Sequence, residues 1–163
     1  MKIVPKGIIV HSMAEYLEWE GEKVTAHEFL KKLGLSVHGF IHPNGDYEKM
    51  ISSPSKAAHA GKSLHEGLSG LNSHYLGFEL LVPGQHDFAT FSKAIETPGT
   101  YTEEQFERAV SVCKWWMDQY KFPASKVVRH SDVSGDDVRG KGKGKTDPGS
   151  AFDWERFKAA LVA

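Results

Sequence analysis

Cysteine is scarce in this sequence, and its scarcity limits the chemistry available to the chain. Cys113 is the only cysteine among 163 residues, so no internal disulfide forms and folding does not depend on an oxidising compartment. The scarcity also excludes a structural zinc site built from several thiolates. Cys113 lies within a helical pattern of apolar residues, which predicts a small buried hydrophobe rather than a nucleophile or a ligand.

Long hydrophobic segments and an excess of charge are also missing. The apolar run near the N-terminus ends at His11 and is too short for a signal-peptide core or a membrane span. The formal net charge of −1 gives no general attraction to nucleic acid or to an anionic membrane. We therefore expect a monomer that is made in the cytoplasm without a signal peptide and that binds neither nucleic acid nor membrane.

The familiar local metal motifs are absent, yet the chain has nine histidines, which is many for its length. His11 and His130 each follow a β-branched run, and Asp147 stands in a Pro-Gly loop. Two imidazoles and one carboxylate suit a catalytic zinc, which takes three protein ligands and keeps a fourth position open. A histidine after an apolar run is more often a hydrogen-bonded core residue, so both interpretations stay open on chemistry alone.

Hydrophobic periodicity predicts one α/β domain over residues 1–163, with a mixed central β-sheet flanked by helices and no separate wall-binding domain. Helices are expected where a capping box precedes an apolar face, and Asn44-Gly45 is a strong hairpin signal. The expected strands are 7–12, 36–42, 46–51, 73–82 and 126–130, and the expected helices are 26–33, 103–120 and 153–162.

Two segments are predicted as loops. Pro83–Thr100 has no clean period and contains two prolines and two glycines, so we expect a long functional loop there. Arg139–Thr146 alternates glycine with lysine, but Arg139 occupies the position of the first glycine that a phosphate-binding loop requires. A flexible, solvated loop is therefore expected for this second segment.

Seven short motifs follow one another between Gly7 and about Phe157. They are Ile8–Ser12, Ser36–Ile41, Asn44-Gly45, Ala57–Gly61, Leu76–Glu79, Arg129–Asp132 and Lys145–Trp154. This series resembles the type 2 N-acetylmuramoyl-L-alanine amidases, which include phage lysozyme-type amidases, cytoplasmic anhydro-muropeptide amidases and animal peptidoglycan recognition proteins. The Lys-Thr-Asp-Pro-Gly run followed by Phe-Asp-Trp is its most specific part.

The resemblance implies one zinc ion per chain, bound by His11, His130 and Asp147. It places an acid–base group at Glu79 and a group that polarises the reacting carbonyl at Lys145. Without the resemblance, the simplest interpretation of Glu79 is a buried carboxylate paired with a base, and that of Lys145 is a solvated loop residue.

The resemblance also suggests two substrate-binding residues. His59 resembles a substrate-contacting position at the wall of the cleft. His38 is a second candidate for substrate binding, and its alternative role is to orient a neighbour through a hydrogen bond.

Two departures from the family pattern affect these assignments. Val37 stands where the phage and animal branches have a tyrosine, so Glu79 must do more of the proton transfer. His130 and Asp147 are separated by seventeen positions, a longer stretch than the family leads us to expect. This length leaves three aspartates as alternative third ligands: Asp132, Asp136 and Asp137.

The function implied is zinc-dependent hydrolysis of the amide bond between N-acetylmuramic acid and L-alanine in peptidoglycan. The short chain favours a phage-type endolysin that acts on the cell wall after release. The alternatives are a cytoplasmic amidase that recycles anhydro-muropeptides, a non-catalytic peptidoglycan-binding module, and a regulatory protein that binds a polymerase. Retention of all three ligands favours an enzyme over a binding module.

Overall fold

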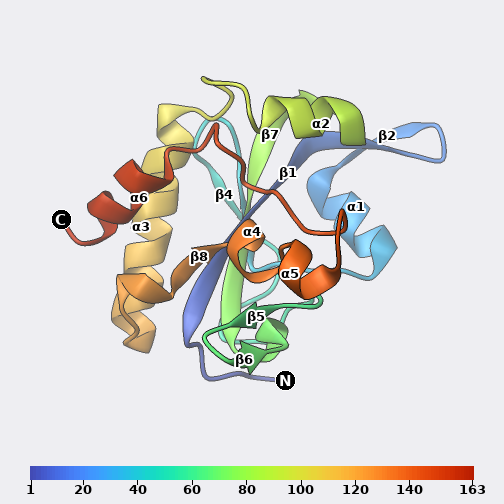
Figure 1. The fold of residues 1–163 in the computed structure, drawn as a ribbon. Coiled ribbons are helices and arrows are strands. Elements are labelled where there is room, and N and C mark those ends of the chain that lie inside the picture. The colour runs from blue at the N-terminus through green and yellow to red at the C-terminus, as the bar shows by residue number, and fades with distance from the viewer.

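A mixed β-sheet forms the centre of the computed structural model, which describes all of residues 1–163 (Figure 1). The strand order is β2-β1-β7-β3-β4, and β8 pairs with β1 outside this path. The strands are β1 (Gly7–Trp19), β2 (Glu22–Thr25), β3 (Gly39–Ile41), β4 (Tyr47–Lys49), β7 (Tyr75–Gln85) and β8 (Val127–Arg129). The single α/β domain with helices around a mixed sheet confirms the predicted fold class.

β1 pairs with three other strands, and its alternating side chains separate the two faces of the sheet. Ile8 and Val10 belong to the large apolar cluster on one face, whereas Ile9 belongs to a smaller cluster on the other. His11 therefore points to the same face as Ile9. The parallel register between β1 and β7 pairs His11 with Glu79, so strand pairing makes these two predicted site residues neighbours.

Two helices, α3 (Glu103–Tyr120) and α6 (Trp154–Leu161), cover the face with the large cluster. Thr102 caps α3 through the predicted box with Gln105. Cys113 is fully buried in this cluster, which confirms its expected place in the core. Burial raises the pKa of its thiol well above the ordinary value, so it stays protonated and unreactive.

The opposite face is covered by shorter elements, which leave room for the candidate site between them. Helix α1 (Ala26–Leu33) has the predicted bounds, with the capping box at Thr25 and a left-handed cap at Gly34. Two one-turn helices follow β8 in the chain, α4 (His130–Val133) and α5 (Asp136–Arg139). The remaining short elements are β5 (Leu64–His65), β6 (Leu68–Ser69), η1 (Leu71–Ser73) and η2 (Ala124–Lys126). None of the helices combines the length and hydropathy that crossing a membrane requires.

The prediction that Pro83–Thr100 is a loop without regular structure is wrong. Strand β7 continues to Gln85, and a further helix, α2, spans Phe88–Ala94. The Asp87 side chain caps α2 by accepting from the Thr90 amide at 2.8 Å. No residue of α2 is buried, so its sequence lacks the periodic apolar pattern from which a helix can be predicted.

The prediction of a flexible Arg139–Thr146 segment is wrong in part. Arg139 ends α5, and its guanidinium donates a hydrogen bond to the Ala60 carbonyl at 2.8 Å. The Asp136 carboxylate accepts from the amides of Gly142 and Gly144 at 3.1 and 2.8 Å, which closes the glycine-rich turn. The lysines of the segment are exposed, as expected.

Several strand ends also differ from the predictions. β1 extends seven residues beyond Ser12 to Trp19 and turns into β2 through Glu20 and Gly21, both with positive φ. The two strands on either side of Asn44-Gly45 are three residues each, shorter than predicted. His130 begins α4 instead of ending a strand.

Candidate metal centre and active site

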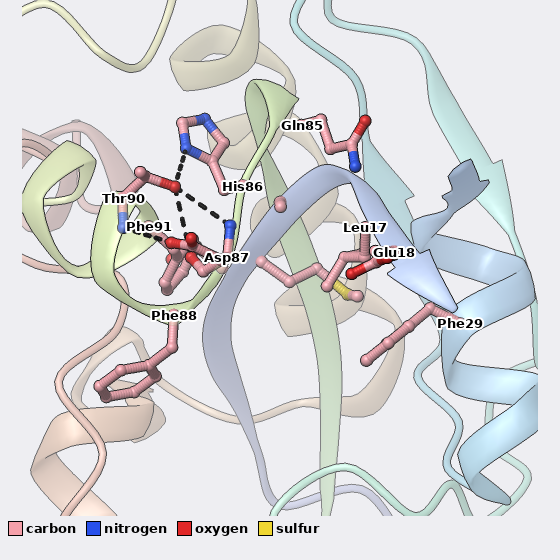
Figure 2. A pocket seen from close by; sticks show the side chains of 12 residues that line it. Leu17, Glu18, Phe29, Gln85, His86, Asp87, Phe88, Thr90 and Phe91 are labelled. Atoms are coloured by element: carbon pink, nitrogen blue, oxygen red, sulfur yellow. Dashed lines mark hydrogen bonds between the residues drawn. The ribbon is translucent and has the colours of Figure 1, made fainter. Parts of the chain in front are cut away.

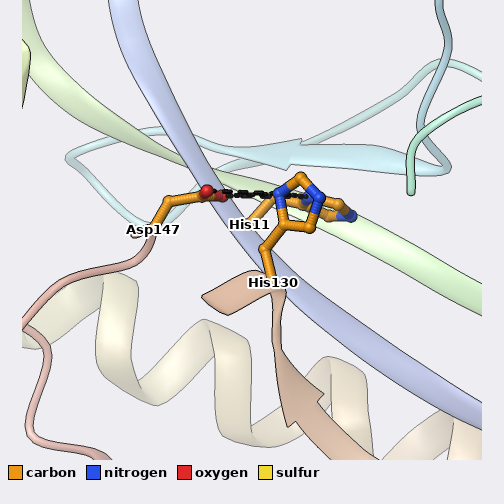
Figure 3. A group of neighbouring side chains, drawn as sticks. All are labelled: His11, His130 and Asp147. Carbon is orange, nitrogen blue, oxygen red and sulfur yellow. Dashed lines mark hydrogen bonds and ion pairs between the residues drawn. The ribbon is translucent and has the colours of Figure 1, made fainter. Parts of the chain in front are cut away.

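Three side chains from distant parts of the sequence converge on one point of the sheet. His11 comes from the middle of β1, His130 from the start of α4, and Asp147 from the loop after α5 (Figure 3). All three are buried, and one ligand atom from each lies within 4.8 Å of the others. The two histidine Nδ1 atoms are 3.1 Å apart, and Asp147 Oδ1 is 3.1 Å from His130 Nδ1.

A chain of hydrogen bonds fixes the tautomer of His11. The Tyr75 carbonyl, which is only an acceptor, takes a hydrogen bond from His59 Nε2 at 3.0 Å. Neutral His59 is then an acceptor at Nδ1, which lies 2.8 Å from His11 Nε2. His11 must therefore donate from Nε2, which leaves the lone pair of its Nδ1 facing His130 and Asp147.

Burial keeps both rings of this chain neutral. Loss of hydration is the largest cause that lowers the pKa of His11 well below its usual range, followed by repulsion from His130. Burial likewise lowers the pKa of His59 to about 3. At neutral pH both imidazoles are uncharged, as a metal ligand and its hydrogen-bond acceptor must be.

The other two ligands are also held by backbone groups. The Ala60 carbonyl lies 3.4 Å from His130 Nε2, a long contact that favours a proton on this nitrogen and a lone pair on Nδ1. The Ser12 amide donates to Asp147 Oδ2 at 3.0 Å and orients the carboxylate. Such support behind each ligand is typical of metal sites.

This arrangement fits a cation. When His11 and His130 both carry their proton on Nε2, two imidazole lone pairs and the Asp147 carboxylate face one another, which is electrostatically unfavourable unless a positive ion lies at the centre. A tetrahedral zinc with bonds of 2.0–2.2 Å would set its ligand atoms roughly 3.3–3.6 Å apart. The separations among His11 Nδ1, His130 Nδ1 and Asp147 Oδ2 are 3.1, 3.2 and 3.8 Å, which are close to the edges of one such face.

Glu79 lies beside this centre, and few interactions compensate for the burial of its carboxyl group. Its side chain is buried, and Oε2 has no hydrogen-bond partner. Burial raises the pKa of its carboxyl well above the ordinary value, and the charge of Asp147 raises it further, whereas Lys145 opposes the shift. The expected pairing of Glu79 in a buried salt bridge is therefore not seen, and a carboxyl with a raised pKa suits proton transfer near neutral pH.

Lys145 is exposed and stands two positions before Asp147 in the sequence. Its amide donates to the Ser134 carbonyl at 2.8 Å, which fixes the backbone from which the side chain extends. Its positive charge lowers the pKa values of both His11 and Glu79, so the ammonium group acts electrostatically on the centre. These contacts are the reason to keep Lys145 as a candidate for stabilising negative charge.

His59 and His38, the two candidate substrate residues, are occupied by the protein itself. His38 is buried, with Nε2 2.7 Å from the Ser55 carbonyl and Nδ1 accepting from the Gly77 amide at 3.1 Å. Both ring nitrogens of His59 are used in the chain described above. The geometry favours an orienting role for each. Gly77 makes room for the pair, since a Cβ there would lie 2.4 Å from His59 Nδ1.

The alternative third ligands are not part of the cluster. Asp132 pairs with Arg129 at 2.9 Å, and Asp136 closes the glycine-rich turn. Ser12 is a site residue that the sequence reasoning missed. Its role depends on a backbone amide, which any residue type supplies, so the sequence carried no signal for it.

The sequence of the chain is similar to those of known amidases. A family model described as N-acetylmuramoyl-L-alanine amidase matches residues 1–150. The 1,6-anhydro-N-acetylmuramyl-L-alanine amidase AmpD of Enterobacter cloacae is 32% identical over 140 residues, which cover 84% of this chain and 64% of that protein. AmpD proteins of other bacteria are 27–30% identical. The chain therefore spans slightly less than two thirds of the length of these relatives.

Solved structures show the same fold. The amidase AmiD from E. coli, in complex with anhydro-N-acetylmuramic acid-L-Ala-D-gamma-Glu-L-Lys, is similar with a TM-score of 0.67 and 21% identity, covering 98% of this chain and 58% of that one. The endolysin amidase LysCS from Clostridium intestinale has a TM-score of 0.64 and 20% identity, covering 99% and 86%. At these identities the likeness establishes the fold alone.

Proposed function

The chain belongs to the N-acetylmuramoyl-L-alanine amidase family, and from that premise we propose that it is a zinc-dependent hydrolase of the muramoyl–L-alanine amide bond. The observation that carries this proposal is the buried cluster of His11, His130 and Asp147, in which lone pairs converge beside a carboxyl group without a partner. Two imidazoles, one carboxylate and an open side are the ligand set of a catalytic zinc.

We further propose that the substrate is a soluble anhydro-muropeptide. The sequence alone favours a phage-type endolysin, and that preference is not confirmed. The support for this proposal is that the curated relatives share the name 1,6-anhydro-N-acetylmuramyl-L-alanine amidase. Endolysin structures share the fold at lower sequence identity, which does not bear on the substrate.

Each site residue has a defined part in this reaction. Zinc held by the three ligands would polarise the amide carbonyl and make an attacking water more acidic. The Glu79 carboxylate accepts the proton of that water and returns it to the amide nitrogen as the C–N bond breaks. The Lys145 ammonium group stabilises the negative charge that develops on the carbonyl oxygen.

The experiment that tests this function is a hydrolysis assay on two substrates. The purified protein, reconstituted with zinc, is incubated with anhydro-N-acetylmuramoyl-L-Ala-D-γ-Glu-L-Lys and with purified sacculi, and released peptide is measured by chromatography and mass spectrometry. We expect release from the soluble substrate, about one zinc per chain, and loss of activity on chelation. The His130→Ala variant is the inactive control. Full activity in a preparation without zinc would contradict the proposal, and preference for sacculi would restore the endolysin interpretation.

A further inference from the structure

The acceptors that orient the two histidine ligands belong to neighbouring residues of one segment. His59 Nδ1 accepts from His11 Nε2 at 2.8 Å, and the Ala60 carbonyl lies 3.4 Å from His130 Nε2. Residues 56–63 belong to no helix or strand. No ladder of backbone hydrogen bonds therefore fixes His59 and Ala60, and their positions depend on other contacts.

Asn72 of η1 supplies a contact that both residues share. Its Oδ1 accepts hydrogen bonds from the backbone amides of His59 and Ala60, at 3.0 and 2.7 Å. Backbone amides only donate, so the atom that faces them must be the side-chain oxygen, whose two lone pairs suit two donors. One atom of Asn72 thus holds the backbone from which both orienting acceptors extend.

Two short polar side chains elsewhere in the protein bond within their own turn. Asn44, the only other asparagine, accepts from the Asp46 amide two positions on, at 2.9 Å. Asp87 accepts from the Thr90 amide three positions on, at the start of α2 (Figure 2). Such local bonds are the common use of these residues in turns and caps. Asn72 instead bonds residues that lie 12 and 13 positions away.

The turn that carries Asn72 is held by other groups. Leu71 is fully buried in the smaller apolar cluster, together with Ala60. The buried Ser63 hydroxyl accepts from the Leu71 amide at 3.0 Å, and the His74 amide donates to the Leu71 carbonyl at 2.9 Å. The side chain of Asn72 bonds only the two amides of the neighbouring segment. Its replacement should therefore leave the turn in place and release the segment.

Resting on the proposed function, we propose that Asn72 is a positioning residue for both histidine ligands. By fixing two adjacent amides, it places the His59 ring behind one ligand and the Ala60 carbonyl behind the other. The Arg139 guanidinium also holds the Ala60 carbonyl, at 2.8 Å, so the larger part of the effect falls on His11.

The test measures the zinc affinity of the folded protein by competition with a chromophoric chelator. Asn72→Ala should lower the affinity about tenfold, the lower end of the range for groups that support metal ligands, because it acts one contact further from the metal. Asn44→Ala is the matched control, since it removes an asparagine bond of the same kind at the hairpin, and should leave the affinity unchanged. Circular dichroism checks folding. If Asn72→Ala does not fold, Asn72→Ser, whose shorter side chain withdraws the acceptor, takes its place with a loss in the same direction.

Rescue by a conservative variant separates positioning from a general loss of packing. Asn72→Asp should restore most of the affinity, because one carboxylate oxygen can accept from both amides. The restored affinity should persist at high ionic strength, where a general attraction between the added charge and the metal ion is screened. With cobalt(II) in place of zinc, the visible absorption bands report the ligand geometry. Asn72→Ala should shift these bands, and Asn72→Asp should return them to the wild-type positions.

A double variant tests whether both ligands are involved. Adding Asn72→Ala to His59→Ala should lower zinc affinity further, by about two- to threefold, because the Ala60 carbonyl still loses its support. No further loss would limit Asn72 to His11 and overturn its assignment to both ligands. Unchanged affinity of the folded Asn72→Ala variant, or an equal loss in Asn44→Ala, would overturn the positioning role altogether.

Zinc affinity requires no hydrolysis, so this inference is separable from the proposed function. A wild type that binds zinc but cleaves no amide would refute the proposed function, and the affinities of the variants would still decide the role of Asn72. Full hydrolysis with equal zinc affinity of the wild type and Asn72→Ala would keep the enzyme assignment and refute the positioning role. At saturating zinc, KM of Asn72→Ala for the anhydro-muropeptide should stay near the wild-type value. A large rise in KM with unchanged zinc affinity would make Asn72 a substrate contact instead.

Discussion

Replacing His59 by alanine should weaken zinc binding without impairing substrate binding. In the wild type, His59 Nδ1 accepts the hydrogen bond from His11 Nε2 at 2.8 Å and so keeps the other nitrogen of His11 free for a metal. In His59→Ala the buried N–H of His11 loses its partner, which costs about 1–3 kcal/mol. Each 1.4 kcal/mol is a tenfold change in affinity, so we expect zinc affinity to fall roughly 10–100-fold, as for other groups that support metal ligands.

The assay is competition for zinc between the metal-free protein and a chromophoric chelator, with circular dichroism to confirm folding. His59→Asn is the conservative control, because an asparagine amide oxygen can take the place of Nδ1 and should restore most of the affinity. Gly77→Ala tests the same contact from the other side, since its Cβ would lie 2.4 Å from His59 Nδ1 and displace the ring. This variant should also lose zinc affinity.

Kinetics at saturating zinc distinguish this role from the substrate contact that the family resemblance suggests. If His59 positions His11, KM of His59→Ala should stay near the wild-type value once the metal site is filled. Unchanged zinc affinity together with a large rise in KM would refute the positioning role and return His59 to the wall of the substrate cleft.

Three further predictions concern single residues of the site and the core. Glu79→Gln should retain zinc but lose about a hundredfold or more in turnover, measured by peptide release. The pKa of the Glu79 carboxyl is raised in the folded state, so its ionisation destabilises the metal-free protein increasingly as pH rises above the unfolded value of about 4.5. At pH 7, with chelator present, Glu79→Gln should therefore melt at a higher temperature than the wild type. An equal or lower melting temperature would contradict the raised pKa. Lys145→Ala should lower turnover about 10²–10³-fold with zinc content unchanged, and near-normal turnover would remove the lysine from the mechanism. Cys113→Ser should keep full activity per folded molecule. It should lose about 1–3 kcal/mol of stability in urea unfolding, because a hydroxyl group replaces a thiol in the apolar core. Inactivity of the folded variant would show that the thiol has a chemical role.

Local signals explain which elements the sequence predicts well. Helices α1 and α3 have their predicted bounds because each combines a capping box with an apolar face over several turns. Helix α2 has a cap of the less common Asp-x-x-Thr type and no buried side at all, so neither signal was sufficient. The second half of β1 was missed because charged residues interrupt the apolar run after Ser12 and most of the positions there are only half-buried.

In the candidate site, too, some features follow from local sequence signals and others do not. The identities of His11, His130 and Asp147 follow from motifs in the sequence, and the structure brings these residues together. The groups that orient these ligands cannot be predicted from the sequence. They are backbone groups: the carbonyl groups of Tyr75 and Ala60 accept hydrogen bonds, and the amide of Ser12 donates one. Backbone groups are the same at every position, so only the folded chain shows which of them meet a ligand.

The spacing of the three ligands has a consequence for the synthesis of the protein. His11 lies near the beginning of the chain, and His130 and Asp147 lie 119 and 136 positions further on. A ribosome produces the chain from the N-terminus at about 5–20 residues per second, so a nascent chain exposes His11 for several seconds before its partners exist. No shortened translation product that stops before Asp147 can assemble the centre. Activity in a cell extract would therefore count only chains translated at least as far as Asp147.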